Sequence, residues 1–325
     1  MFIKFFKSKA PILIIALFVI AVVLWVDIFT NDIEPFTSAA SMPLFNFVFN
    51  LFGNIKWLIV ITAFGLLFFQ TIILNNLATD HEFASRNTYL PALVYIILMS
   101  SSVNSFPINP VLFCNFFLLV ALNILFELYG KHESYFDVLN ISLLISIASL
   151  FYFPCIFFLL LFWIAFIVYQ IFSLREWIIS IIGIIIPYFF LGLYYFWKDI
   201  LVIRAHQYFK IISDLKHFSL KISSYQIILY STIAAILLFA FYSLLTRTKE
   251  KAIKNRKFNS IIFWFLILGI VSIAFASEYS SFHYGIAFIP ASLLISNYFM
   301  QCKRKWWAET IFVILLGVVV YGTFF

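Results

Sequence analysis

About eleven apolar segments, each roughly the length of a membrane-crossing helix, follow one another along this 325-residue chain. A helix needs about 20 mainly apolar residues to cross the hydrocarbon core of a bilayer, where every backbone N–H and C=O must find its partner within the protein. The mean hydropathy is +1.06, and only 11% of the residues are charged, against about 25% in soluble domains. The sequence therefore predicts an all-α, polytopic integral membrane protein.

The apolar windows define the predicted spans and leave little chain between them. They cover residues 11–29, 56–77, 88–105, 110–129, 136–152, 154–172, 176–197, 226–246, 260–276, 285–301 and 307–325. No linker or soluble domain separates them, so we expect one membrane domain over residues 1–325. A charged start followed by an apolar stretch is also found in cleaved signal peptides, but the small residues of Ser38–Ser41 lie too far beyond the apolar core for a typical cleavage site.

Basic residues set the predicted orientation, because Lys and Arg remain on the cytoplasmic side when helices insert. Lys4, Lys7 and Lys9 place the N-terminus inside, and alternation through the spans then puts most of the 21 Lys and Arg residues in cytoplasmic loops. The cluster from Arg247 to Lys257 would face anionic lipid head groups. We expect a protein of the bacterial inner (cytoplasmic) membrane with its C-terminus outside, and no nucleic-acid partner despite the net charge of +7.

The sequence lacks the usual signatures of soluble enzymes. It has no Walker A loop, no Gly-rich dinucleotide loop, no His-Glu-x-x-His and no Gly-x-Ser-x-Gly, which argues against ATP hydrolysis, Rossmann redox chemistry, HExxH zinc proteolysis and lipase chemistry. Ionisable residues of the spans lie near span ends, which weighs against an ion-coupled transporter. The cysteines Cys114, Cys155 and Cys302 suggest no disulfide framework and are interpreted as small buried hydrophobes.

Polar residues within the spans allow two interpretations. The spans contain amide side chains at Asn115, Asn123, Asn140 and Gln170. These could line the path of a lipid flippase or channel, but hydrogen bonds between helices are the interpretation we favour. Ser142, Ser146 and Ser149 recur at helical spacing, which predicts the close approach of a neighbouring helix.

The first predicted outer loop, residues 30–55, carries carboxylates beside the membrane. Asp32 and Glu34 follow the first span, and residues 44–52 are predicted to form a short interfacial helix. Two carboxylates could bind a divalent cation beside a phosphate, or one could deprotonate a sugar hydroxyl. Because Asp-x-Glu is a short motif, it is also compatible with an acidic loop that has a helix cap. The sequence identifies no particular metal.

The fourth outer loop, about residues 198–225, predicts an amphipathic interfacial helix. Its apolar face would contain Leu201, Ala205, Tyr208, Ile212 and Leu215. Arg204 and Lys210 could bind a phosphate by charge-assisted hydrogen bonds, and His206 could orient or protonate a leaving phosphate. Electrostatic adhesion to ordinary phospholipids is the alternative. Glu278 and His283 of a further outer loop would lie on the same side and could complete a binding cleft.

The order of these features resembles the GT-C class of glycosyltransferases, which take sugars from polyprenyl-phosphate donors. That class has a seven-helix module, an acidic motif and interfacial helices in the first outer loop, and an interfacial helix in the fourth outer loop. Residues 1–225 are similar in organisation, through Asp32-x-Glu34, the 44–52 helix and the 200–217 helix. Residues 226–325 would add four transmembrane helices. The first outer loop is short for the class and no large periplasmic domain follows, so the catalytic pocket would be small or missing.

The chain also resembles a polytopic membrane family of Bacteroidota with no established activity, in the segments Asn75–Leu77, Tyr89–Leu93 and Leu150–Pro154.

The GT-C resemblance implies an enzyme that moves a sugar from a polyprenyl-phosphate donor to a lipid or glycan acceptor at the outer face. Asp32 or Glu34 would be the base or metal ligand. The alternatives are a non-catalytic subunit of an envelope assembly, with membrane-protein partners, or a lipid or solute transporter.

Overall fold

The regular structure of the chain is helical wherever it is described. The computed structural model describes residues 2–7, 12–30, 42–52, 55–83, 88–103, 106–131, 134–213, 223–247, 253–275, 280–302 and 304–324. In the first half of the chain the helices are α1 (Phe2–Phe6), α2 (Ile12–Leu24), α3 (Val26–Thr30), α4 (Pro43–Phe52), α5 (Lys56–Asp80), α6 (Leu90–Val103), α7 (Pro110–Glu127) and α8 (Tyr135–Phe151). They are followed by η1 (Phe153–Phe157), α9 (Phe158–Tyr169), α10 (Leu174–Trp197), α11 (Leu201–Ser213), α12 (Ser224–Arg247), α13 (Ile253–Ile273), η3 (Ser281–Tyr284), α14 (Gly285–Gln301) and α15 (Lys305–Phe324).

A helix occupies each of the predicted spans, and both predicted interfacial segments are helical as α4 and α11. Among the described residues, six helices are long and apolar enough to cross a membrane, namely α5, α7, α10, α12, α13 and α15. The apolar helices α2, α6, α8 and α9 are shorter. The prediction of an all-α membrane protein is therefore confirmed, whereas helix length alone supports six crossings rather than eleven.

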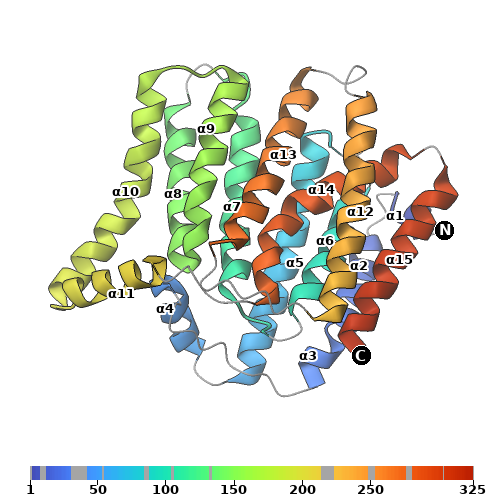
Figure 1. The fold of residues 1–325 in the computed structure, drawn as a ribbon, viewed down its shortest axis with the longest axis horizontal. Coiled ribbons are helices and arrows are strands. Elements are labelled where there is room, and N and C mark those ends of the chain that lie inside the picture. Colours follow the sequence, from blue (N-terminus) through green and yellow to red (C-terminus); the bar gives the residue numbers. More distant parts are fainter. Residues whose placement is uncertain are drawn as a thin grey trace.

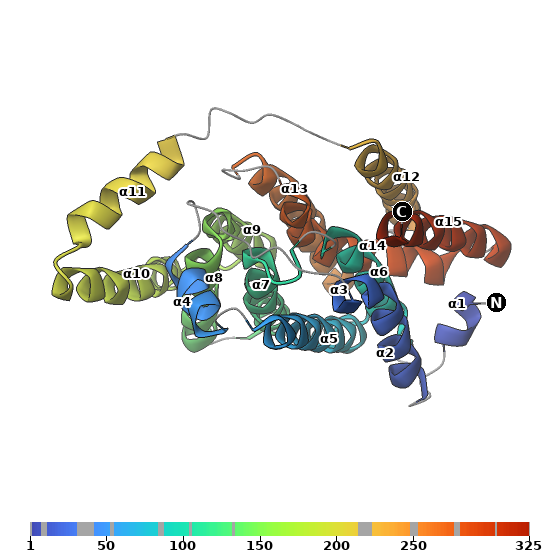
Figure 2. The same cartoon turned by 90° about the horizontal axis from the view of Figure 1, so that it is seen from below.

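The longer helices run up and down the molecule, and α11 runs across their lower end toward α4 (Figure 1). Seen from that end, α10 and α11 form one edge of the molecule and α12 and α15 form the opposite edge (Figure 2). Between these edges lie α6 and α14, which are buried along nearly their whole length. The middle of the bundle is therefore a packed core, whereas the helices at its two edges have exposed side chains.

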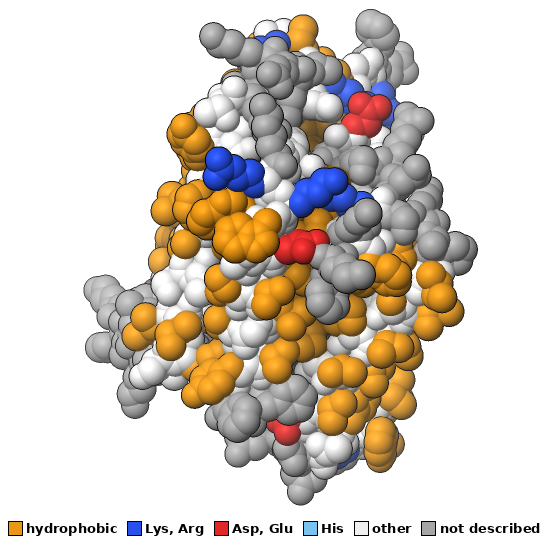
Figure 3. Space-filling model, turned by 90° about the vertical axis from the view of Figure 1, so that its right-hand side faces the viewer, with side chains coloured by type: hydrophobic (Ala, Val, Ile, Leu, Met, Phe, Trp, Pro, Cys, Tyr) orange, Lys and Arg blue, Asp and Glu red, His pale blue; other side chains and the backbone are white. Residues whose placement is uncertain are grey.

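The outer surface of the bundle is apolar. In α10 only 11% of the residues in the membrane-length window are buried, and Phe190 and Trp197 are among its exposed side chains. On the flank nearest α15, hydrophobic side chains cover much of the visible surface, and most of the visible Lys and Arg side chains lie in its upper half (Figure 3). An apolar surface of this extent is suited to contact with lipid chains rather than with water.

Polar side chains inside the bundle bond between helices. The Gln70 amide donates to the Leu112 carbonyl at 2.7 Å and accepts from the Tyr95 hydroxyl at 2.8 Å, which joins α5, α6 and α7. Asn115 donates from α7 to the Gly285 carbonyl of α14 at 3.0 Å. For Asn115 the interpretation as an interhelical hydrogen bond is confirmed. Gln170 instead ends α9 in a left-handed conformation, with φ at 65°.

The serine face of α8 packs against α10, as its spacing predicts. Ser146 Oγ donates to the Ile184 carbonyl at 2.8 Å, and Ser149 Oγ lies 2.7 Å from the Tyr188 hydroxyl. Opposite Ser142 stands Gly183, where an added Cβ would collide with the Ser142 hydroxyl. Small side chains on both helices therefore set their separation.

A disulfide joins Cys114 of α7 to Cys155 of η1, which corrects the prediction that the cysteines are separate small hydrophobes. Both are fully buried, whereas Cys302 is half-buried and free. The sequence gives no sign of the pairing because the partners lie in different spans. Since α7 and α8 are antiparallel neighbours, the start of α7 and the end of α8 meet at one end of the bundle, and this brings the two thiols together.

Candidate functional site

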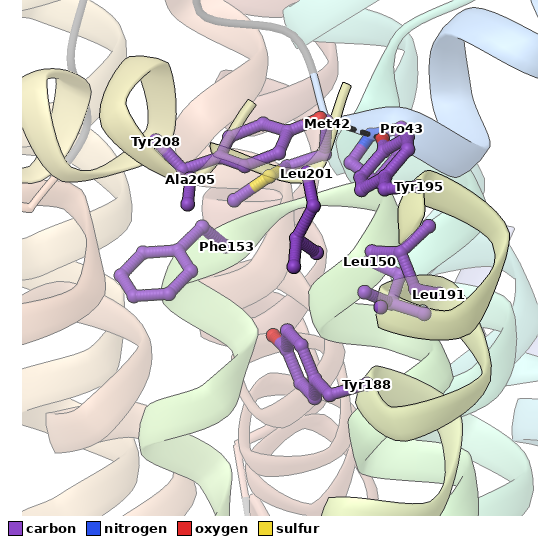
Figure 4. A pocket seen from close by; sticks show the side chains of 11 residues that line it. Met42, Pro43, Leu150, Phe153, Tyr188, Leu191, Tyr195, Leu201, Ala205 and Tyr208 are labelled. Atoms are coloured by element: carbon purple, nitrogen blue, oxygen red, sulfur yellow. Dashed lines mark hydrogen bonds between the residues drawn. The ribbon is translucent and has the colours of Figure 1, made fainter. Parts of the chain in front are cut away.

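An apolar cavity of about 310 Å³ lies beneath α11, on the side of this helix that faces α8 and α10 (Figure 4). Its wall comes from the start of α4, the end of α8, η1, α10 and α11. The lining residues are Met42, Pro43, Leu150, Phe153, Tyr188, Leu191, Gly192, Tyr195, Leu201, Ala205 and Tyr208. Almost all of these present carbon to the cavity, so the interior suits a hydrocarbon chain.

A sharp turn between α10 and α11 creates the cavity. Asp199 adopts φ of 53°, in the left-handed region, and the Ile200 N–H bonds back to the Tyr195 carbonyl at 3.1 Å. This 6→1 bond is the Schellman ending of a helix. Asp tolerates the left-handed conformation better than most residues because its short side chain can bond locally. The turn directs α11 across the end of the bundle, so that the helix covers the space between α8 and α10.

The predicted apolar face of α11 is confirmed for three of its five residues, which line the cavity. Leu201, Ala205 and Tyr208 recur at helical spacing and all belong to the cavity wall. Leu201 and Ala205 are nevertheless exposed, so the cavity is open on the side of α11. Leu215 and the Ile212 side chain, the other predicted members of this face, lie outside the described residues.

Two tyrosine hydroxyls lie at the α11 side of the cavity. Tyr195 of α10 and Tyr208 of α11 have their oxygens 3.1 Å apart, and Figure 4 shows this bond beside Met42 and Pro43. Burial raises the pKa of the Tyr208 hydroxyl above its usual 10.0, and the hydrogen bond with Tyr195 adds to this, while the charge of Arg204 acts in the opposite direction. Tyr208 is therefore a neutral phenol near pH 7, within electrostatic reach of Arg204.

The deeper wall has its polar groups satisfied. The Tyr188 hydroxyl bonds to Ser149 Oγ at 2.7 Å, and Ser149 donates in turn to the Ser146 carbonyl at 2.6 Å. Both available hydroxyl protons are used if Tyr188 donates to Ser149. Leu150 and Leu191 complete this part of the wall with carbon. A ligand would thus meet an apolar interior and, near α11, a polar rim.

Arg204 and His206 both lie exposed on α11. Arg204 Nη1 donates to Gln207 Oε1 at 3.0 Å, one turn before Tyr208. His206 follows Arg204 by two positions, so the helix places it on a different side. Lys210 belongs to the same helix, but its side chain lies outside the described residues.

Of the other predicted site residues, the structure describes only His283, which does not line the cavity. His283 is buried in η3, where its Nδ1 lies 2.8 Å from the Tyr152 hydroxyl, and its ring packs on Phe282. Asp32, Glu34 and Glu278 lie outside the described residues. Over the part of the chain that the structure describes, no group of three or more His, Cys, Asp or Glu residues could hold a metal ion.

Neither Tyr195 nor Tyr208 was predicted as a binding residue. Tyr208 belongs to the predicted apolar face, and its spacing of four residues from Arg204 indicates that the two side chains are neighbours on the helix. Tyr195 belongs to a predicted span, and only the turn at Asp199 brings it to Tyr208. The assembled site therefore combines an apolar pocket suited to a hydrocarbon chain with the cation of Arg204 and the hydroxyls of Tyr195 and Tyr208.

The interpretation of this site depends on its own residues, because comparisons with known proteins give no match. No protein family, no curated protein and no solved structure matches the chain.

Proposed function

We propose that this protein is a GT-C-like membrane glycosyltransferase, which binds a polyprenyl-phosphate sugar beneath α11 and transfers the sugar to a lipid or glycan acceptor at the outer face of the bacterial inner membrane. The observation that supports the proposal best is the apolar cavity, together with the charge of Arg204, which acts on the hydroxyl of the cavity residue Tyr208. A polyprenyl phosphate has the matching parts, a long hydrocarbon chain and an anionic group. Charge-assisted hydrogen bonds from Arg suit a phosphate.

The proposal assigns eleven crossings to the bundle. They are α2 with α3, α5, α6, α7, α8, η1 with α9, α10, α12, α13, α14 and α15. The positions of the charges support it, because exposed Lys254 and Arg256 begin α13 at the end of the molecule opposite α11 (Figure 1). Short helices can cross where the bilayer thins locally or flanking residues reach toward the interface. In this orientation α4 and α11 lie in the outer interface.

The proposed chemistry uses carboxylates of the first outer loop. Asp32 or Glu34 would take the proton from an acceptor hydroxyl, whose oxygen then bonds to the anomeric carbon of the sugar. The bond between that carbon and the phosphate oxygen breaks, and polyprenyl phosphate leaves with its charge held by Arg204. Met42, which lines the cavity, follows the same loop in sequence and supports this assignment.

Native mass spectrometry of the detergent-purified protein tests the proposal. The wild type should retain a polyprenyl phosphate or its sugar derivative, and the variant with Arg204→Ala and Lys210→Ala should lose it. Arg256→Ala is the matched control, because it removes an exposed cation from the opposite end of the molecule. Retention of bulk phospholipids alone, unchanged by the substitutions, would contradict the proposal and favour a structural or transport role.

Once the donor is known, Asp32→Asn tests the catalytic assignment. The amide keeps the shape of the carboxylate and removes its basicity, so sugar transfer should fall by about 100-fold or more if Asp32 is the base. Donor retention should be unchanged in the same variant. Full transfer activity in both Asp32→Asn and Glu34→Gln would remove the assigned role.

A further inference from the structure

The hydroxyls of Tyr195 and Tyr208 share one hydrogen bond, which uses only one of their two O–H donors. Each phenol carries one O–H and can accept through its lone pairs. Whichever hydroxyl donates across the 3.1 Å between them, the O–H of the other remains uncommitted. Neither hydroxyl has another hydrogen-bond partner among the residues that the structure describes. Since both residues line the cavity, the pair offers one donor to a bound molecule.

This donor persists at neutral pH. The pKa of Tyr208 is raised, first by burial and then by the hydrogen bond with Tyr195. A phenol with a raised pKa keeps its proton near pH 7, so the pair acts as a hydrogen-bond donor rather than as a base.

A positive charge accompanies the donor. Arg204 precedes Tyr208 by one helical turn on α11, and its charge acts on the Tyr208 hydroxyl. The guanidinium holds Gln207 Oε1 at 3.0 Å through Nη1, which leaves further N–H groups of its fork for an anion. A cation and an O–H on the same side of an apolar cavity would bind an anionic oxygen attached to a hydrocarbon chain.

We propose that Tyr195 and Tyr208 together recognise the head group of the ligand, through one O–H donated to a phosphate oxygen that Arg204 also binds. The assignment rests on the proposed function. It says which residues distinguish a lipid phosphate from a neutral lipid that has the same hydrocarbon chain. The cavity supplies affinity for the hydrocarbon chain, and the tyrosine pair supplies, together with Arg204, the preference for phosphate. The shared chemistry is a phosphate oxygen, which belongs to a lipid or to free phosphate.

Three probes separate these contributions in binding titrations with the full-length protein in detergent. Farnesyl phosphate carries chain and phosphate, farnesol carries the chain alone, and inorganic phosphate carries the anion alone. The wild type should bind farnesyl phosphate more tightly than farnesol and bind inorganic phosphate weakly. Inorganic phosphate that binds as tightly as farnesyl phosphate would overturn the assignment to a lipid.

The double variant Tyr195→Phe, Tyr208→Phe should lose about tenfold or more in affinity for farnesyl phosphate, the loss expected for one hydrogen bond to a charged group. Its affinity for farnesol should be kept, which also shows that the cavity is intact. Each single variant should retain most of the preference for phosphate, because the remaining hydroxyl no longer donates to its partner and can donate to the ligand. This non-additivity is not expected of two tyrosines that merely pack.

Tyr194→Phe is the matched control, because Tyr194 neighbours Tyr195 on α10, is 56% exposed and does not line the cavity. It should leave the affinities for both farnesyl probes unchanged. A double variant that keeps the wild-type preference for farnesyl phosphate would overturn the role of the pair and leave the proposed function standing. A wild type that does not distinguish farnesyl phosphate from farnesol would instead contradict the proposed function as well.

Discussion

At the scale of single residues, the absence of a side chain at Gly183 sets how closely α10 approaches α8. A Cβ at this position would collide with Ser142 Oγ and lie 2.9 Å from Ser142 Cβ and 3.2 Å from the Leu139 carbonyl. Gly183→Ala should therefore lower the free energy of unfolding by about 1–3 kcal/mol, the usual cost of overpacking. The measurement is the thermal unfolding midpoint in detergent, followed by tryptophan fluorescence.

Two further variants show whether the contact is the cause. Ser142→Ala removes the colliding hydroxyl, so in the Gly183→Ala background it should restore part of the lost stability. Gly65→Ala is the control, because no atom beyond the nearby backbone of its own helix lies within 4 Å of a Cβ added there. An unfolding midpoint in Gly183→Ala equal to that of Gly65→Ala would contradict the proposed contact.

His81, which follows α5, gives the fold a dependence on pH. Its ring packs against Phe126 and Phe258, with centroids 5.2 and 5.5 Å away, and its Nε2 lies 3.4 Å from Asn123 Oδ1. Burial is the main reason that the pKa of His81 is lowered below 6.5, although the hydrogen bond to Asn123 opposes it. The unfolded chain then binds a proton more readily than the folded protein, so stability falls as the pH drops through 6.5.

His81→Phe should remove this part of the pH dependence, because Phe fills the aromatic site and has no proton to gain. Unfolding midpoints at pH 7.5 and pH 5 should differ less in the variant than in the wild type. His206→Phe is the control, because His206 is exposed on α11. An equal decrease on acidification in wild type and His81→Phe would show that other groups cause it.

Helical periodicity explains which site residues could be predicted. Leu201, Ala205 and Tyr208 share a face because positions three and four apart lie one above the other on a helix. The same spacing places Arg204 next to Tyr208. Tyr195 could not be predicted in this way. Its contact with Tyr208 depends on the left-handed turn at Asp199, and tertiary geometry of that kind leaves no periodic pattern in the sequence.

At the scale of elements, the disulfide fixes η1 against α7 next to the cavity. Cys155 lies two residues after Phe153, a residue of the cavity wall. Replacing Cys114 and Cys155 by Ser should lower stability by about 2–4 kcal/mol and weaken ligand retention, because the wall gains freedom. Thermal unfolding and native mass spectrometry measure the two effects. Cys302→Ser, which removes the free thiol, should change neither.

Helices were easier to predict from sequence than contacts between them. The predicted spans and both interfacial segments coincide with helices because apolar runs and the 3.6-residue period act within one segment. The disulfide and the site beneath α11 combine residues from several segments. Their assembly depends on which ends of the helices meet, and the hydropathy of a single window contains no such information.

At the scale of the whole molecule, the number of crossings decides on which side each loop lies. Length selects six helices, whereas the proposed topology also uses the shorter apolar helices and α14. In the proposed topology, α12, α13 and α14 separate α11 from Cys302, so the two lie on opposite sides of the membrane. If only the six long helices crossed, α12 and α13 alone would separate them, and both would lie on the same side. One pair of labels therefore distinguishes the two topologies.

Cys302 is a natural reporter for this test, because the other two cysteines are joined in a disulfide. A membrane-impermeant maleimide added to intact bacteria in which the outer barrier is opened should leave Cys302 unlabelled, and should label it once the inner membrane is permeabilised. In a Cys302→Ser background, Lys198→Cys, at the exposed turn before α11, should be labelled without permeabilisation. Equal accessibility of the two positions from one side would contradict the eleven-crossing topology. It would also remove the basis for placing a phosphate-binding site at the outer face, because that assignment follows from the opposite location of α11 and the basic loops.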